Sequence, residues 1–121
     1  MTCVWKAIAS ALKIKLKPLE LFKHIKKHNT ITKDIIWNGQ PLTQKLYEQN
    51  FKDIHSLENG DIMRGNGYLC GGCAPLLFLV AQIYKVSIEH EHNGHVMRYK
   101  NIKHPGKTIY LYSNAVHMWT D

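Results

Sequence analysis

The spacing of apolar residues changes after Tyr84, and this change constrains the fold more than any other feature of the sequence. Before Tyr84, apolar side chains recur every three or four residues, as on one face of a helix. After it they alternate in short pieces, which the turn signals Asn93-Gly94 and Pro105-Gly106 separate. Helices followed by strands predict an α+β fold. We therefore expect a helical N-terminal half packed on a small, mostly antiparallel sheet.

The expected elements follow from the same spacing. Helices are predicted over residues 3–15, 18–27, 41–50 and 75–84, and Pro18 and Pro75 suit the first turn of a helix. Strands are predicted over residues 86–89, 96–99 and 108–112, with residues 117–120 continuing or following the last of them. Glycine-rich residues 59–73 are expected to form a loop.

Size and composition indicate one soluble domain. A chain of 121 residues can bury a single core, and no apolar run is long enough to span a bilayer. Lysines interrupt any signal-peptide pattern near the start. Three cysteines argue against a disulfide framework and for a reducing, cytoplasmic compartment.

The net charge of +7 is concentrated in the first third of the chain. Such a cluster can attract nucleic acid, but Phe22 is the only aromatic residue among these lysines that is placed to stack on a base. A solvated helix face explains the lysines better. We expect no membrane or nucleic-acid partner from this cluster.

Cys3 opens the first expected helix. A thiol attacks a carbonyl carbon as the thiolate, which the N–H groups and dipole at a helix N-terminus stabilise. A nearby imidazole would hold the thiolate and later protonate the leaving amine. A small apolar residue at the start of a buried helix explains Cys3 equally well from spacing alone.

Among the eight histidines, His117 stands out because Val116, Met118 and Trp119 surround it with bulky apolar side chains. Four others lie in polar surroundings and are expected to be solvated, namely His24, His28, His55 and His104. The remaining three flank the Asn93-Gly94 turn, and two of them share one face of a regular strand, which also suits a metal site. These are His90, His92 and His95, with His90 and His92 on the shared face.

Three blocks of the sequence together cover most of the chain. The first is Cys3-Val4-Trp5-Lys6-Ala7-Ile8. The second is Gly71-Gly72 with Leu77, Val80, Ala81, Ile83, Tyr84 and Ile88-Glu89. The third is Ile109, Leu111, Tyr112 and His117, followed by Met118 and Trp119. In this order the blocks resemble the ovarian tumour (OTU) cysteine proteases, which are deubiquitinating enzymes, and the first block is similar to the nucleophile block of that family.

The resemblance implies a single OTU-like, papain-like cysteine protease domain over residues 1–121, or one excised from a larger polyprotein. It assigns Cys3 as the nucleophile and His117 as the general base and acid. It further implies ubiquitin, or a ubiquitin-like modifier, as the partner, with cleavage after its C-terminal Gly-Gly. Gly71, Gly72 and Trp119 would bind that tail. We expect a monomer without a cofactor, more viral than cellular in character, that acts in the host cytoplasm and also cleaves its own polyprotein.

Two features differ from the family pattern. Only Met1 and Thr2 precede the nucleophile, where the family usually has an Asp and a Gly. Trp119 occupies the position of the usual third residue, an Asp or Asn two positions after the histidine. Asp121 would lie about 13 Å further along an extended strand. Asn114 is therefore the candidate that orients the imidazole, provided that the chain turns after Ser113.

Three alternatives remain open from the sequence. Cys70-Gly71-Gly72-Cys73 before a helix suits a redox site, although such sites follow a buried strand and residues 59–68 are loop-like. Cys70 and Cys73 with two of His90, His92 and His95 would complete a tetrahedral zinc site. A basic nucleic-acid-binding module would explain the charge but not the three ordered blocks.

Overall fold

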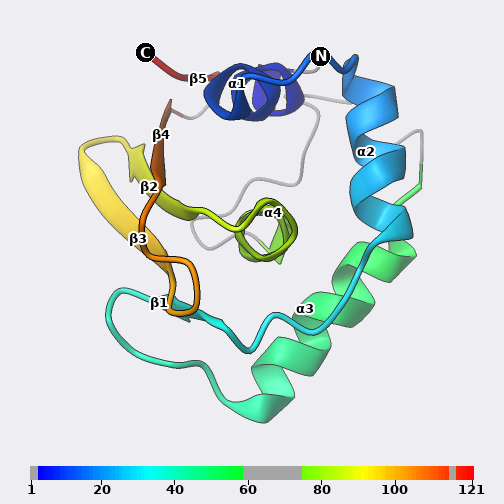
Figure 1. The fold of residues 1–121 in the computed structure, drawn as a ribbon, viewed down its shortest axis with the longest axis vertical. Coiled ribbons are helices and arrows are strands. Elements are labelled where there is room, and N and C mark those ends of the chain that lie inside the picture. Colours follow the sequence, from blue (N-terminus) through cyan, green and yellow to red (C-terminus); the bar gives the residue numbers. More distant parts are fainter. Residues whose placement is uncertain (1–2, 59–74, 115–116) are drawn as a thin grey trace.

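The computed structural model describes residues 3–58, 75–114 and 117–121, which form an α+β fold (Figure 1). This confirms the expected fold class. The elements in chain order are α1 (Cys3–Leu12), α2 (Pro18–Lys27), β1 (Ile35–Trp37), α3 (Gln44–Ser56), α4 (Pro75–Tyr84), β2 (Ser87–His92), β3 (His95–Asn101), β4 (Thr108–Ser113) and β5 (Met118–Trp119).

The five strands form one sheet in the order β1-β3-β2-β4-β5. Neighbouring strands are antiparallel except β2 and β4, which run parallel with Ser87 opposite Thr108. Asn93 and Gly94 both have positive φ (49° and 86°), which suits the two-residue turn that joins β2 to β3. The sheet is therefore mostly antiparallel, as expected, and β5 is one of its edges.

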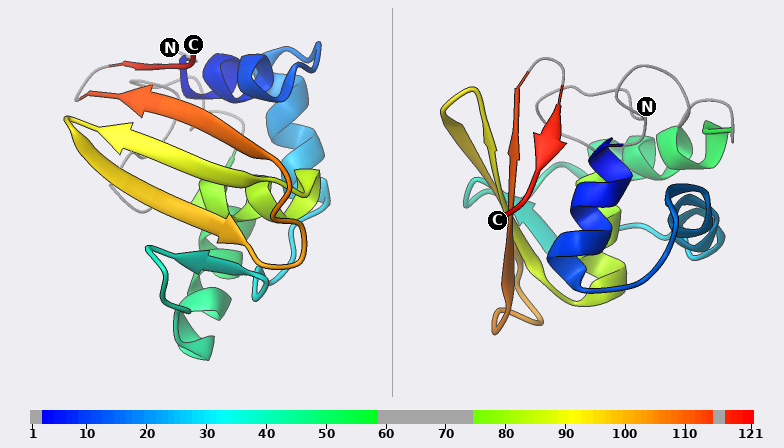
Figure 2. Two further views of the ribbon diagram at one scale, coloured as in Figure 1. Left: turned by 60° about the vertical axis from the view of Figure 1, so that its left-hand side comes forward. Right: turned by 90° about the horizontal axis from the view of Figure 1, so that it is seen from above.

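The helices cover one face of the sheet, with α1 beside β5 at the edge (Figure 2). Trp5 of α1 is 1% exposed and packs edge-to-face on Phe22 of α2, with ring centroids 5.5 Å apart. Phe78 of α4 makes the same kind of contact with Tyr99 of β3, at 5.1 Å. These contacts fix α1 and α4 against the rest of the core.

The third helix and the first strand differ from the prediction. Helix α3 begins at Gln44, because the side chain of Thr43 accepts a hydrogen bond from the Leu46 N–H and caps the helix. It continues to Ser56, beyond the predicted end at Asn50. Strand β1 was not predicted, since three residues are too few to show alternation. Its residues pair with β3, which the sequence of β1 does not reveal.

Candidate functional site

A pocket of about 490 Å³ lies between α1 and the C-terminal strand β5. The described residues that line it come from the two ends of the chain. The α1 side consists of Cys3, Lys6, Ala7 and Ser10, and the β5 side of His117, Met118, Trp119 and Thr120. The cysteine and histidine that the sequence suggested as a pair thus line the same pocket.

The sequence of α1 explains how Cys3 comes to face this pocket. The four pocket residues of α1 are spaced i, i+3, i+4 and i+7, which places them on one side of a helix. Buried apolar residues, including Val4, Trp5 and Ile8, point the rest of the helix into the core. Cys3 is half-buried and is the first residue of α1. Burial of the apolar residues therefore fixes the rotation of α1 that turns Cys3 toward β5.

His117 is held by a turn between β4 and β5. The N–H of Asn114 donates to the carbonyl of His117 at 2.9 Å. In return, the N–H of His117 donates to Oδ1 of Asn114, also at 2.9 Å. Ser113 pairs with Met118 across the antiparallel strands, so the chain does reverse after Ser113. Asn114 thus fixes the backbone of His117, and a role in orienting the imidazole stays a prediction.

Trp119 stacks on the imidazole that it follows by two positions. The His117 and Trp119 ring centroids are 5.8 Å apart with an interplanar angle of 14°. Tyr112 in turn stacks on Trp119, with centroids 6.2 Å apart and an interplanar angle of 20°. The Tyr112 hydroxyl donates to Oδ2 of Asp121 at 3.0 Å, which raises the pKa of Tyr112. The rings of Tyr112 and Trp119, which Asp121 anchors through the Tyr112 hydroxyl, therefore pack against His117.

A second polar cluster lies at the end of β4, next to the turn that carries His117. Ser113 Oγ lies 2.6 Å from Nε2 of His90 and 2.7 Å from Nδ1 of His92. His90 is 3% exposed, and its Nδ1 is buried without a hydrogen-bond partner among the described residues. The shared face of His90 and His92 was predicted, but Ser113 was not, because only the parallel pairing of β2 with β4 brings it there.

This cluster makes the stability of the fold depend on pH. Burial, and secondarily the imidazole of His92, lower the pKa of His90 to about 4. In the unfolded chain the pKa is about 6.5, so the unfolded state binds more protons between these values. Stability therefore falls as the pH falls from about 6.5 to about 4. One pKa unit corresponds to about 1.4 kcal/mol, and after a reduction for solvent screening we expect a loss of about 2 kcal/mol.

Urea unfolding at about pH 7 and about pH 4.5 measures this loss. His90→Gln keeps a hydrogen-bonding side chain that does not titrate, and its stability should change less between the two pH values than that of the wild type. His104→Gln, at an exposed histidine, should behave like the wild type. Equal pH dependence in all three proteins would show that His90 does not titrate as described.

Several predicted site residues lie outside the described residues. They are the substrate-binding candidates Gly71 and Gly72 and the thiols Cys70 and Cys73. Within the described residues, no group of three or more His, Cys, Asp and Glu side chains is arranged to hold a metal ion. Helices long and apolar enough to cross a membrane are also absent from that part of the chain. The redox and zinc alternatives, which use Cys70 and Cys73, stay untested.

Lys6, Ser10 and Thr120 line the pocket but were not predicted as site residues. The sequence indicates the positions of two of these three residues. Lys6 and Ser10 follow from the helical spacing that starts at Cys3. Thr120 does not, because its place depends on the pairing of β5 with β4.

Comparison with known proteins adds no family to this description. No protein-family model matches the chain, no curated protein matches its sequence, and no solved structure matches its fold.

Proposed function

We propose that the chain is a thiol-dependent peptidase that uses Cys3 as the nucleophile and His117 as the general base and acid. The observation that supports this most is the pocket that both residues line, one from the start of α1 and one from the turn before β5. The substrate that the family resemblance implies is the C-terminal Gly-Gly of ubiquitin or a ubiquitin-like modifier.

The reaction requires two displacements. The Cys3 thiolate attacks the carbonyl carbon, and the tetrahedral intermediate collapses to a thioester as the C–N bond breaks. The imidazolium of His117 gives its proton to the leaving amine. A water molecule then attacks the thioester carbonyl and His117 accepts a proton from it. The C–S bond breaks, the carboxylic acid leaves, and the Cys3 thiolate re-forms beside the His117 imidazolium. These two steps need no oxidant and no metal ion.

Two features of the site suit this chemistry. The first N–H groups of a helix point out of its N-terminal end, so those at the start of α1 are suitable donors to the oxyanion that develops beside Cys3. The stack of Trp119 on His117 limits the rotation of the imidazole. In this proposal, Trp119 positions the ring by packing, where a carboxylate would do so by a hydrogen bond.

Hydrolysis of ubiquitin with a fluorophore on its C-terminal amide tests the proposal. The wild type should release the fluorophore, and Cys3→Ala should not, because the other catalytic groups cannot replace the nucleophile. Cys70→Ser/Cys73→Ser is the matched control, which should keep activity if Cys3 is the reacting thiol. Activity in Cys3→Ala, or none in the wild type, would contradict the proposal.

A further inference from the structure

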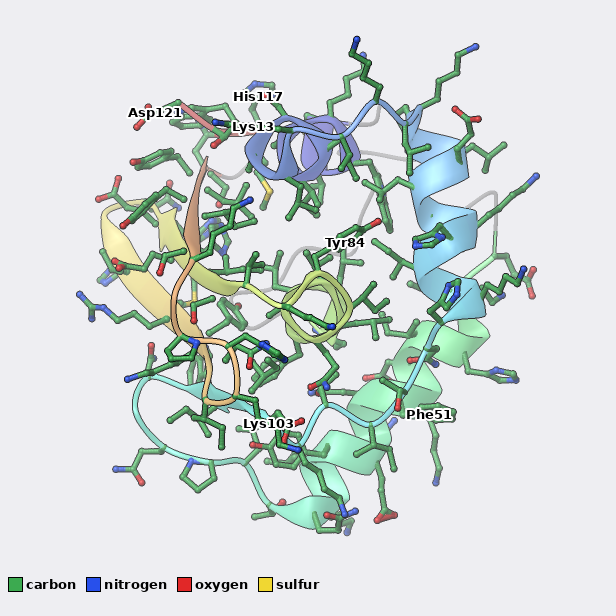
Figure 3. The ribbon with its side chains drawn as sticks, in the orientation of Figure 1. Lys13, Phe51, Tyr84, Lys103, His117 and Asp121 are labelled. Carbon is green, nitrogen blue, oxygen red and sulfur yellow. The ribbon has the colours of Figure 1, made fainter. Side chains whose placement is uncertain are left out.

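A second hollow adjoins the site pocket along α1. This hollow has a volume of about 260 Å³ and shares Ser10 and Thr120 with the site pocket. It extends past the end of α1 to Lys13 and Lys107. Figure 3 shows His117, Lys13 and Asp121 at the same end of the molecule. The two hollows therefore form one groove that runs from Cys3 and His117 to Lys13 and Lys107.

The groove is positively charged. Among the described residues, its lining includes the cations Lys6, Lys13 and Lys107 and a single carboxylate side chain, Asp121. That carboxylate accepts a hydrogen bond from Tyr112. None of the three lysines forms an ion pair with another described residue. We call this surface, from Lys6 to Lys13 and Lys107, the lysine groove.

Its length sets the size of a segment that it can hold. Lys13 follows Cys3 by ten residues of helix, which corresponds to about 15 Å along the axis of α1. An extended peptide rises about 3.3 Å per residue, so about four to five residues span this distance. A side chain at the fourth or fifth residue from the reacting bond would therefore reach Lys13 and Lys107.

We infer that the lysine groove binds the segment that follows the cleaved bond and selects an Asp or Glu at its fourth or fifth residue. The inference rests on the proposed function, because Cys3 and His117 place the cleaved bond at one end of the groove. The positive charge of the lysine groove indicates which side of the cleaved bond it binds. The ubiquitin tail is basic and is repelled by three lysines, whereas an acidic segment on the leaving-group side is attracted.

Lys13 offers a substitution that removes charge without harming the fold. It has φ of 58°, and the N–H groups of Lys13 and Ile14 bond to the carbonyls of Ser10 and Ala9, which closes the end of α1. Glycine is favoured at this position, so Lys13→Gly should not destabilise the protein. Lys85 has φ of 56° after α4 and lines neither hollow, which makes Lys85→Gly a matched control.

Binding is measured with the Cys3→Ala protein, which lacks the nucleophile and therefore does not cleave. The ligands are fluorescent peptides in which Gly-Gly is followed by a neutral spacer. Peptides with Glu at the fourth or fifth following residue should bind about three- to tenfold more tightly than Gln peptides at low salt. Lys13→Gly with Lys107→Gln should remove this preference, and Lys85→Gly should keep it. The preference should also weaken as salt is added.

Equal binding of Glu and Gln peptides, or a preference confined to residues before the bond, would overturn the inference. Displacement of the bound fluorescent peptide by an RNA oligonucleotide, but not by an unlabelled acidic peptide, would also overturn it. Because the peptides are bound and not cleaved, these results are independent of whether ubiquitin is the substrate. Failure of the proposed function appears separately, as loss of hydrolysis of the ubiquitin amide.

Discussion

Replacing His117 with alanine is expected to lower kcat/KM for hydrolysis of a ubiquitin C-terminal amide by about 100- to 10,000-fold. A positioned general acid and base contributes a factor of this size, and His117 is the imidazole that lines the pocket with Cys3. The loss should appear mainly in kcat, because proton transfer occurs in the transition state and not in substrate binding. Steady-state hydrolysis over a range of substrate concentrations separates the two parameters.

His104→Ala is the control for this variant, since His104 is exposed and lies in the connection between β3 and β4, away from the pocket. It should keep wild-type kinetics. His117→Ala should also keep the wild-type unfolding midpoint, because its side chain is exposed. Equal loss of activity in both variants, or a His117→Ala protein as active as the wild type, would exclude His117 as the acid and base.

Replacing Trp5 with alanine is expected to destabilise the fold by about 3 to 5 kcal/mol. Trp5 is 1% exposed and packs edge-to-face on Phe22, so its removal leaves a cavity between α1 and α2. A small domain has a total stability of only about 5 to 15 kcal/mol, so this one substitution removes much of it. Urea unfolding gives the change in free energy.

Trp5→Phe keeps an aromatic ring at the same place and should lower the free energy of unfolding less than Trp5→Ala does. Because Trp5 follows Cys3 by two residues, loss of its packing should also loosen the start of α1. We therefore expect Trp5→Ala to lose hydrolysis before it unfolds completely, whereas Trp5→Phe keeps most of it. A Trp5→Ala protein as stable as the wild type would show that α1 is not held by this contact.

The helices and the hairpin could be predicted because their signals are local. The Pro75–Tyr84 helix has a proline at its start and apolar residues throughout, and the turn at Asn93-Gly94 has the residues that positive φ requires. Strand β1 was missed because Ile35–Trp37 is too short for alternation, and its partner β3 comes some sixty residues later. The start of α3 was misplaced because Pro41 resembled a helix start, but Thr43 provides the cap.

The candidate site was predicted only in part, for the same physical reason. Cys3 and His117 each have a distinctive local setting, but their shared pocket depends on β5 lying beside α1, which is a tertiary contact. The contact of Ser113 with His90 and His92 depends on the parallel pairing of β2 with β4. The lysine groove joins Lys13 to Lys107, and no local pattern of sequence relates them.

Trapping the reacting thiol tests the central claim most directly. Ubiquitin that carries an electrophile at its C-terminus should form one covalent adduct with the wild-type protein, and peptide mapping by mass spectrometry should place it on Cys3. Labelling should be absent in Cys3→Ala, much slower in His117→Ala and unchanged in His104→Ala. An adduct on Cys70 or Cys73, or labelling of Cys3 at the same rate without His117, would contradict the pairing of Cys3 with His117.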